Sequence, residues 1–209
     1  MLKILIADDH EIVRRGIKQI LLEEFSFVQI EEADDTGSLV EKALNDDWDI
    51  IISDMAMPGG GGLTALKVIK EKAPAIPVLF FSTYSEEQYA LRVIKAGANG
   101  YLNKETATDE LCKAVKQVLA GRIYVSPAIA ETLGLSLIEK TPTLPHELLS
   151  PRELNIFIML ASGKSVIEIA TTLSLASTTI STYRSRILTK LNLKTNADLT
   201  LYALEHKFI

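Results

Sequence analysis

The sequence predicts an α/β domain with a doubly wound, parallel five-stranded sheet, followed by a small all-α domain of four helices. Three observations lead to this prediction. A chain of 209 residues suits two domains better than one. Short apolar runs alternate with helical patterns over residues 1–120, which indicates successive βα units. After residue 148 only helical periods follow, each preceded by a capping sequence.

The predicted strands are short and continuously apolar. Runs such as "ILIA", "DIII" and "VLFF" indicate burial on both faces, which is typical of parallel sheets. The predicted strands cover 2–8, 27–33, 49–54, 77–82 and 100–102, and the predicted helices cover 11–24, 36–45, 62–72, 86–96 and 107–120. A Ser85-to-Gln88 capping box is expected at the fourth helix.

The pattern loosens from residue 121 to residue 149, where three prolines and one short predicted helix, 127–138, occur. We therefore expect a first domain at 1–121, a linker at 122–147 and a second domain at 148–209. The second domain has four helix starts. Capping boxes are expected at Ser150, Ser165 and Thr195, and Ser177 is expected to cap the third helix.

The composition is that of an ordinary globular protein, with 47% hydrophobic and 23% charged residues. The N-terminal apolar run is too short for a signal peptide, and no run approaches the roughly 18 residues of a membrane span. With a single cysteine no internal disulfide is expected, so we predict a cytoplasmic protein without a membrane partner.

Charge divides unevenly along the chain. Residues 1–145 contain 15 Lys and Arg against 22 Asp and Glu, a net charge of −7, whereas residues 146–209 contain 7 against 5, a net charge of +2. No acidic residue lies between Glu168 and Asp198. An acidic first part and a locally basic second part indicate two different tasks.

Polar side chains follow four of the predicted strands. Asp8 and Asp9 end the first strand, Asp54 the third and Ser82 the fourth, and Lys104 follows the fifth. The carboxyl ends of parallel strands form one edge, where ligands bind at a topological switch point. Three clustered carboxylates repel one another and imply a cation, and oxygen ligands suit Mg²⁺. A single acid at a strand end is usually solvated or capping, but the joint pattern is much rarer.

These residues carry a resemblance. The segments "ILIADDH", "DIIISDMAMPGGGG" and "PVLFFSTYSEEQYALRVIKAGANGYLNK" resemble the flavodoxin-like receiver domain of two-component response regulators, over residues 1 to about 120. The resemblance implies that Asp54 accepts a phosphoryl group from a sensor histidine kinase. It also implies that Asp9, Asp54 and the Ala56 carbonyl hold Mg²⁺, with Asp8 acting through water.

The same resemblance implies roles for three further residues. Lys104 would neutralise charge on the phosphoryl group, and Ser82 and Tyr101 would form the switch that follows phosphorylation. The glycines after Asp54 allow close approach of the backbone, and they predict a mobile loop. Two rival interpretations fail: "GGGGLTAL" has no P-loop lysine, and a haloacid-dehalogenase-type phosphatase needs an Asp where Ala56 stands.

The third helix of the second domain divides into two faces. An apolar stripe is predicted to be buried, and the opposite face carries small hydroxyl side chains flanked by cations. The unit resembles the LuxR-type helix-turn-helix through "LSPRE", "ASGKSVIEIA" and "ILTKL". This resemblance implies base or sugar contacts by Thr178, Ser181, Thr182 and Ser185, and phosphate contacts by Arg184, Arg186 and Lys190.

Together the two resemblances indicate a NarL/FixJ-type response regulator. We expect a phosphorylation-gated transcriptional regulator that binds double-stranded DNA as a homodimer and turns over no external substrate. The family often has Lys at the position where this chain has Ser181. The absence of that cation lowers the DNA affinity expected for this chain. An alternative is a receiver-controlled switch whose C-terminal helices bind a protein; the acid-free basic stretch favours DNA.

Overall fold

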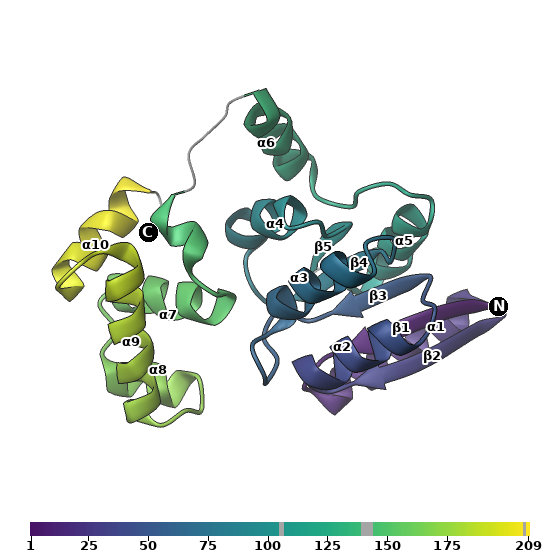
Figure 1. The fold of residues 1–209 in the computed structure, drawn as a ribbon, viewed down its shortest axis with the longest axis horizontal. Coiled ribbons are helices and arrows are strands. Elements are labelled where there is room, and N and C mark those ends of the chain that lie inside the picture. The colour runs from purple at the N-terminus through teal and green to yellow at the C-terminus, as the bar shows by residue number, and fades with distance from the viewer. Residues whose placement is uncertain (105–106, 139–143, 207) are drawn as a thin grey trace. The chain divides into compact units, whose positions relative to one another are not determined.

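The computed structural model describes residues 1–104, 107–138, 144–206 and 208–209, and contacts divide the chain into two units, Met1–Lys140 and Thr141–Ile209 (Figure 1). The division falls inside the predicted linker. Helix α6, Pro127–Ile138, occupies the range where a short helix is predicted and groups with the first unit.

The first unit is built on a five-stranded sheet with the strand order β2-β1-β3-β4-β5, and every neighbouring pair is parallel. This confirms the predicted flavodoxin-like fold. Strand order reverses between β1 and β3, which creates the switch point. The elements are β1 Leu2–Ala7, α1 Glu11–Glu24, β2 Val28–Ala33, α2 Thr36–Asn45, β3 Ile50–Ser53, α3 Gly62–Lys72, β4 Val78–Ser82, α4 Glu86–Lys95, β5 Gly100–Asn103 and α5 Ala107–Leu119.

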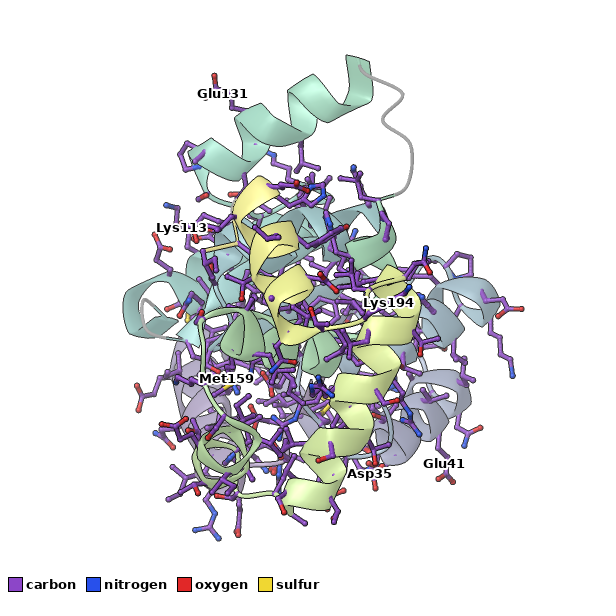
Figure 2. The ribbon with its side chains drawn as sticks, turned by 90° about the vertical axis from the view of Figure 1, so that its left-hand side faces the viewer. Asp35, Glu41, Lys113, Glu131, Met159 and Lys194 are labelled. Atoms are coloured by element: carbon purple, nitrogen blue, oxygen red, sulfur yellow. The ribbon has the colours of Figure 1, made fainter. Side chains whose placement is uncertain are left out.

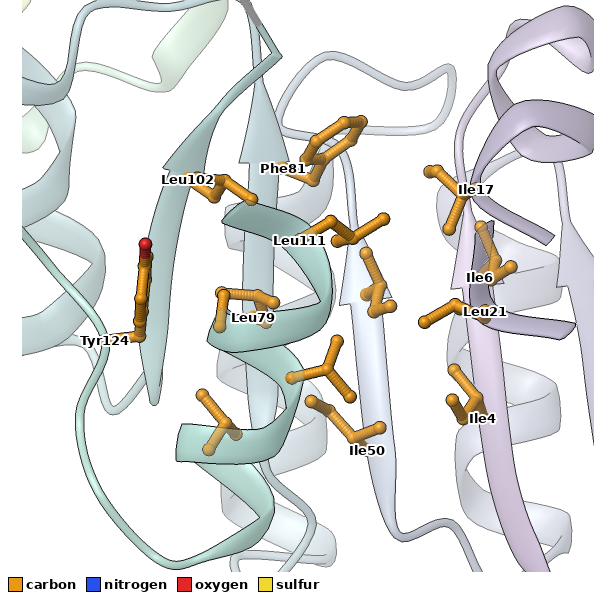
Figure 3. Packing of buried hydrophobic residues seen from close by; sticks show 14 residues of the cluster. Ile4, Ile6, Ile17, Leu21, Ile50, Leu79, Phe81, Leu102, Leu111 and Tyr124 are labelled. Carbon is orange, nitrogen blue, oxygen red and sulfur yellow. The ribbon is translucent and has the colours of Figure 1, made fainter. Parts of the chain in front are cut away.

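Helices cover both faces of this sheet. Helices α1 and α5 share one hydrophobic cluster with inward residues of β1, β3, β4 and β5, among them Ile4, Ile50 and Leu79 (Figure 3). Helices α2, α3 and α4 lie over the other face (Figure 1). Burial on both faces explains the continuous apolar runs of the strands, and their parallel direction brings all the carboxyl ends to one edge.

The chain after α5 returns to the sheet. Tyr124 forms a parallel bridge with Gly100, its amide donates to the Asn99 carbonyl at 3.0 Å, and its carbonyl accepts from the Tyr101 amide at 2.8 Å. Helix α6 then packs on α4 and buries Ile129, while Glu131 is exposed (Figure 2).

Two predicted helix caps are wrong. Ser85 precedes α4 but makes no side-chain capping bond, because its hydroxyl donates to Glu87 Oε2 at 2.5 Å; the Gln88 side chain lies outside the described residues. The third helix of the second unit has Ala176 at its N-cap position, with no side-chain capping bond, and already includes Ser177, so Ser177 lies inside the first turn rather than before it.

The second unit contains a 3₁₀ turn and four α-helices: η2 Pro145–Leu148, α7 Pro151–Ala161, α8 Val166–Thr172, α9 Ser177–Leu191 and α10 Asn196–Glu205. The capping boxes predicted at Ser150, Ser165 and Thr195 are confirmed. A short turn joins α8 to α9, with Ser174 at a φ of 52°, and this is the helix-turn-helix arrangement. Nowhere in the described part of the chain is a helix both long and apolar enough to cross a membrane.

Candidate phosphoacceptor site and nucleic-acid interface

The sheet brings the predicted acidic residues to one edge. Asp8 follows β1 and Asp54 follows β3, and these two strands are neighbours whose register pairs Ala7 with Ser53. Asp8 is 1% exposed and Asp54 is 5% exposed. Two carboxylates are therefore buried side by side at the switch point, an arrangement that needs a compensating cation.

Lys104 supplies positive charge between them. Its Nζ lies 2.5 Å from Asp8 Oδ2 and 3.2 Å from Asp54 Oδ1, and it follows β5 directly. The structure thus joins three of the predicted site residues through one ammonium group. A cation shared between buried carboxylates can also stabilise a negatively charged phosphoryl group that approaches them.

The Asp54 carboxylate is only partly satisfied by the protein. Its Oδ2 accepts from the Ala56 amide at 3.1 Å, whereas Oδ1 faces the Lys104 ammonium at 3.2 Å. Burial raises the pKa of Asp54, and Asp8 raises it further, against the opposing effects of Lys104 and the Ala56 amide. Oδ1 of the nucleophile, held by the protein through the Lys104 ion pair, can therefore bind a cation or attack.

The residues present fit a hard divalent cation. Asp8, Asp9 and His10 offer ligand atoms within 4.8 Å of one another, but Asp54 is outside this group. Asp9 is half-exposed, and its Oδ1 lies 2.8 Å from His10 Nδ1. Carboxylate oxygens, such as those of Asp8, Asp9 and Asp54, are the ligands that Mg²⁺ prefers.

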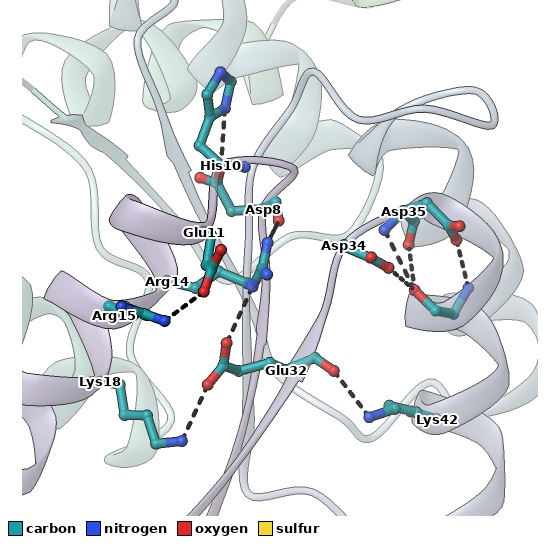
Figure 4. A network of polar contacts seen from close by, with 11 residues as sticks. Asp8, His10, Glu11, Arg14, Arg15, Lys18, Glu32, Asp34, Asp35 and Lys42 are labelled. Carbon is teal, nitrogen blue, oxygen red and sulfur yellow. Dashed lines mark hydrogen bonds and ion pairs between the residues drawn. The ribbon is translucent and has the colours of Figure 1, made fainter.

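Sequence reasoning missed a residue that holds this edge in place. Arg14 of α1 donates from Nη1 to the Asp8 carbonyl at 2.6 Å and from Nε to Glu32 Oε2 at 3.1 Å. Lys18 also binds Glu32, at 3.0 Å (Figure 4). The network ties α1 and β2 to the end of β1. In the sequence, Arg14 is marked only as a cation in a predicted helix near an acidic strand, and this pattern is too common to identify a functional residue.

The predicted switch residues, Ser82 and Tyr101, are both buried. The Ser82 hydroxyl accepts from the Tyr84 amide at 3.4 Å, and the Tyr101 hydroxyl donates to the Tyr84 carbonyl at 2.8 Å. Burial raises the pKa of Tyr101, so the phenol stays neutral. Both residues thus contact the β4–α4 loop, and Ser82 ends the strand next to β3.

Helix α9 has the two predicted faces. Ile180, Ile187, Leu188 and Leu191 are buried, whereas Thr178, Ser181, Thr182 and Ser185 are exposed. The Ser181 and Thr182 hydroxyls donate to the carbonyls four residues before them, each at 3.0 Å. Each hydroxyl oxygen keeps acceptor capacity toward solvent.

The three predicted phosphate contacts differ in what they bind within the unit. Lys190 Nζ pairs with Glu153 Oε2 at 2.6 Å and donates to the Leu148 carbonyl at 3.3 Å. Arg184 Nε donates to Asn196 Oδ1 at 2.6 Å. Arg186 is exposed. Lys194, in the turn before α10, is exposed as well (Figure 2).

Glu153 explains why Lys190 is held. Burial alone would raise the pKa of this carboxyl, but hydrogen bonds from Lys190 and from the Ser150 amide outweigh it and hold the pKa below its usual range. Glu153 closes the capping box of α7, so Lys190 ties α9 to the start of α7. Sequence reasoning could not separate this cation from the others, because all of them lie on one polar helix.

Family models agree with this division of the chain. Residues 4–116 match the response regulator receiver domain, and residues 147–203 match the luxR family of bacterial regulatory proteins. The first match alone covers more than half of the chain. The chain belongs to the response regulators that join a receiver domain to a luxR-type helix-turn-helix.

Individual relatives match over the whole length. Response regulator UvrY of Escherichia coli K12 is 35% identical over 207 residues, which is 99% of this chain and 95% of UvrY. Response regulator GacA of Pseudomonas aeruginosa is 34% identical over 210 residues, covering 100% of this chain and 98% of GacA. Among solved structures, RcsB of Salmonella enterica serovar Typhimurium bound to promoter rprA in the presence of the phosphomimetic BeF₃⁻ is 27% identical, with a TM-score of 0.59 over 97% of this chain and 98% of RcsB.

Proposed function

We propose that Asp54 is the phosphoacceptor of this regulator and that its phosphorylation controls DNA binding by the second unit. The observation that carries the proposal is the position of Asp54: buried at the switch point, beside Lys104, with one carboxylate oxygen that accepts no hydrogen bond. A carboxylate buried without full compensation is costly, and this arrangement is typical of a functional group rather than of a structural one.

The chemistry is a phosphoryl transfer. An oxygen of Asp54 attacks the phosphorus of a phosphohistidine on the partner kinase. The bond between phosphorus and the histidine nitrogen breaks, and its electron pair leaves with that nitrogen, which is then protonated. Lys104 lies where the transferred group arrives and offsets its charge. A small donor such as acetyl phosphate would replace the kinase in the same step.

Asp8, Asp9 and Asp54, with the carbonyl of Ala56, would hold Mg²⁺. The ion would supply charge neutralisation for the phosphoryl oxygens. The chain's own contribution is to keep these carboxylates together: Lys104 bridges Asp8 and Asp54, and the Ala56 amide fixes Asp54 Oδ2. Ser82 and Tyr101, both anchored to Tyr84, would then rearrange around the acyl phosphate.

The second unit would bind double-stranded DNA through the hydroxyl face of α9. RcsB, a related regulator, has been solved as two dimers bound to two DNAs, and we propose a homodimer for this chain as well. Its partner would be the chromosome, so the protein would act in the cytoplasm. Short side chains let the helix approach base edges, and the flanking cations reach the phosphates.

The acceptor role is tested by labelling. Wild-type protein and Asp54→Asn are incubated with acetyl phosphate and Mg²⁺, and the phosphoprotein is measured by intact mass. Wild type is expected to gain one phosphoryl group and Asp54→Asn none. Asp9→Ala should label weakly and recover at high Mg²⁺, because it loses a ligand and keeps the nucleophile. Undiminished labelling of Asp54→Asn would overturn the assignment.

A further inference from the structure

The loop after Asp54 is folded back against the peptide that follows the nucleophile. Gly59, Gly60 and Gly61 have φ values of 87°, 120° and 81°, which side chains rarely adopt. A Cβ at Gly61 would lie 2.6 Å from the Met55 carbonyl oxygen, and one at Gly62 would lie 2.2 Å from that of Asp54. The glycines are therefore needed for close contact, and not only for freedom of the chain.

One residue of another element holds this loop at two points, once through its backbone and once through its side chain. Thr36, the first residue of α2, donates its amide to the Pro58 carbonyl at 3.0 Å. Its Oγ1 accepts from the Gly61 amide, also at 3.0 Å. Between these two anchors, a Cβ on Gly59 would lie only 3.2 Å from Thr36 Cβ. Thr36 thus fixes the loop on both sides of Gly59 and Gly60.

The position of Thr36 is not explained by helix capping. Asp35 caps α2, and its carboxylate accepts from the Ser38 amide at 2.7 Å (Figure 4). A threonine at the first helical position normally exposes its hydroxyl, but Thr36 is only 6% exposed, and its oxygen serves a residue 25 positions away. The contact therefore serves the loop.

Loop position determines the geometry of the nucleophile. The Gly62 amide donates to the Met55 carbonyl at 3.0 Å, so the loop closes directly on the residue between Asp54 and Ala56. Ala56 in turn orients Asp54 Oδ2 through its amide. A shift of the loop would move the Ala56 peptide, and with it the carboxylate and the carbonyl proposed to bind Mg²⁺.

We propose that Thr36 is a positioning residue for phosphoryl transfer: its hydroxyl holds Gly61 and so fixes the Met55–Ala56 backbone beside Asp54. This inference rests on the proposed acceptor role of Asp54. Misplacement of reacting groups by about 1 Å lowers rates up to roughly 100-fold, so loss of the hydroxyl should lower the rate of phosphoryl transfer by roughly 10- to 100-fold.

The test compares Thr36→Val with Thr36→Ser in the full chain. Valine keeps the shape of threonine and removes the acceptor, whereas serine keeps the acceptor. Phosphorylation by acetyl phosphate is followed over time at several Mg²⁺ concentrations. Thr36→Val is expected to react at least 10-fold more slowly and to need more Mg²⁺ for half its maximal rate, and Thr36→Ser is expected to stay close to wild type.

Thr64→Val is the matched control. Thr64 is exposed, and its hydroxyl donates to the Gly60 carbonyl at 2.8 Å, so this variant removes a threonine contact to the same loop without freeing the Gly61 amide. It should leave the rate and the Mg²⁺ dependence unchanged. If valine at position 36 unfolds the chain, Thr36→Ala, which also lacks the acceptor, replaces it with the same expected loss.

A folded Thr36→Val or Thr36→Ala that reacts like wild type would overturn the inference. Equal losses in Thr36→Ser and Thr36→Val would overturn it too, because the hydroxyl would then not be the cause. Failure of the proposed function would give a different result, because the Asp54→Asn protein would then still be phosphorylated by acetyl phosphate. Labelling that needs Asp54 but not the Thr36 hydroxyl would leave the acceptor assignment standing.

Discussion

The buried acidic site contains fewer positive charges than negative ones. Lys104 is shared by Asp8 and Asp54, which are 1% and 5% exposed, and Asp9 adds a third carboxylate at the rim. Arg14 donates to the backbone carbonyl of Asp8 and pairs with Glu32, so its charge is directed to Glu32 rather than to the Asp8 carboxylate. A site with excess negative charge is unstable by itself and gains from any cation or from loss of one carboxylate.

This imbalance predicts a pH-dependent stability difference between wild type and Asp54→Asn. Burial raises the folded-state pKa of Asp54 above 3.8. Wild type therefore loses stability as pH rises from the unfolded-state pKa through the folded-state pKa. At pH 7 Asp54→Asn should therefore be more stable than wild type, and the difference should shrink as pH falls toward about 4.

Urea unfolding followed by tryptophan fluorescence measures this difference. Trp48 is the single tryptophan, is 6% exposed and lies in the first unit, so its signal reports on that unit. Added Mg²⁺ should stabilise wild type more than Asp54→Asn. A mutant that is less stable than wild type at pH 7 would show that Asp54 is fully compensated in the folded protein.

Most residues of the acidic site could be predicted from the sequence, but the residues that hold the site in position could be predicted less well. Asp8, Asp54 and Lys104 follow strands and Ser82 ends one. Parallel strand ends meet at one edge, so the proximity of these residues could be predicted from strand order. Thr36 could not be found in this way. Its contact with Gly61 depends on the path of a loop whose conformation no local pattern specifies.

Helix α9 shows what periodicity predicts at the scale of an element. Its buried and exposed faces could be predicted because core packing selects one face. The division of its cations could not, since Lys190 is held by Glu153 while Arg186 lies on the same polar side, exposed. Similarly, the wrong cap at Ser177 is an error of one residue, the usual uncertainty of helix ends.

The cations of α9 should therefore behave differently when removed. Arg186→Ala is expected to weaken binding to selected and scrambled duplexes equally and to lower the salt slope by about one unit. Thr182→Ala is expected to lower specificity by about 1–3 kcal/mol at one base position.

Lys190→Ala should mainly destabilise the second unit, by roughly 1–3 kcal/mol, because Glu153 loses its partner.

Duplex binding at two salt concentrations and thermal unfolding separate these effects. Lys190→Gln, which keeps a donor for Glu153, is the control for the ion pair. If Thr182→Ala leaves the specificity ratio intact while Arg186→Ala abolishes it, the wrong face of α9 has been assigned to the DNA groove. An unchanged melting temperature in Lys190→Ala would contradict the structural role of that lysine.

At the scale of the whole molecule, the first unit extends beyond its sheet along the chain, as far as α6. Tyr124 pairs with the backbone of β5, next to the switch residue Tyr101. The Ser126 amide, just before α6, donates to Glu86 Oε1 of α4 at 2.7 Å. β5 and α4 flank the proposed switch residues. Both contacts therefore offer a physical connection between the phosphorylation state of Asp54 and the start of the segment that begins with α6.

Phosphorylation is expected to produce a dimer. One recognition helix contacts few bases, so specific affinity requires two half-sites about 34–36 Å apart. In sedimentation experiments the phosphorylated or BeF₃⁻-treated wild type with Mg²⁺ should double its mass, whereas Asp54→Asn should remain a monomer under both conditions. An activated wild type that remains a monomer and still binds a two-half-site duplex as tightly as expected for a dimer would contradict this prediction, since a single α9 would then supply all the specificity.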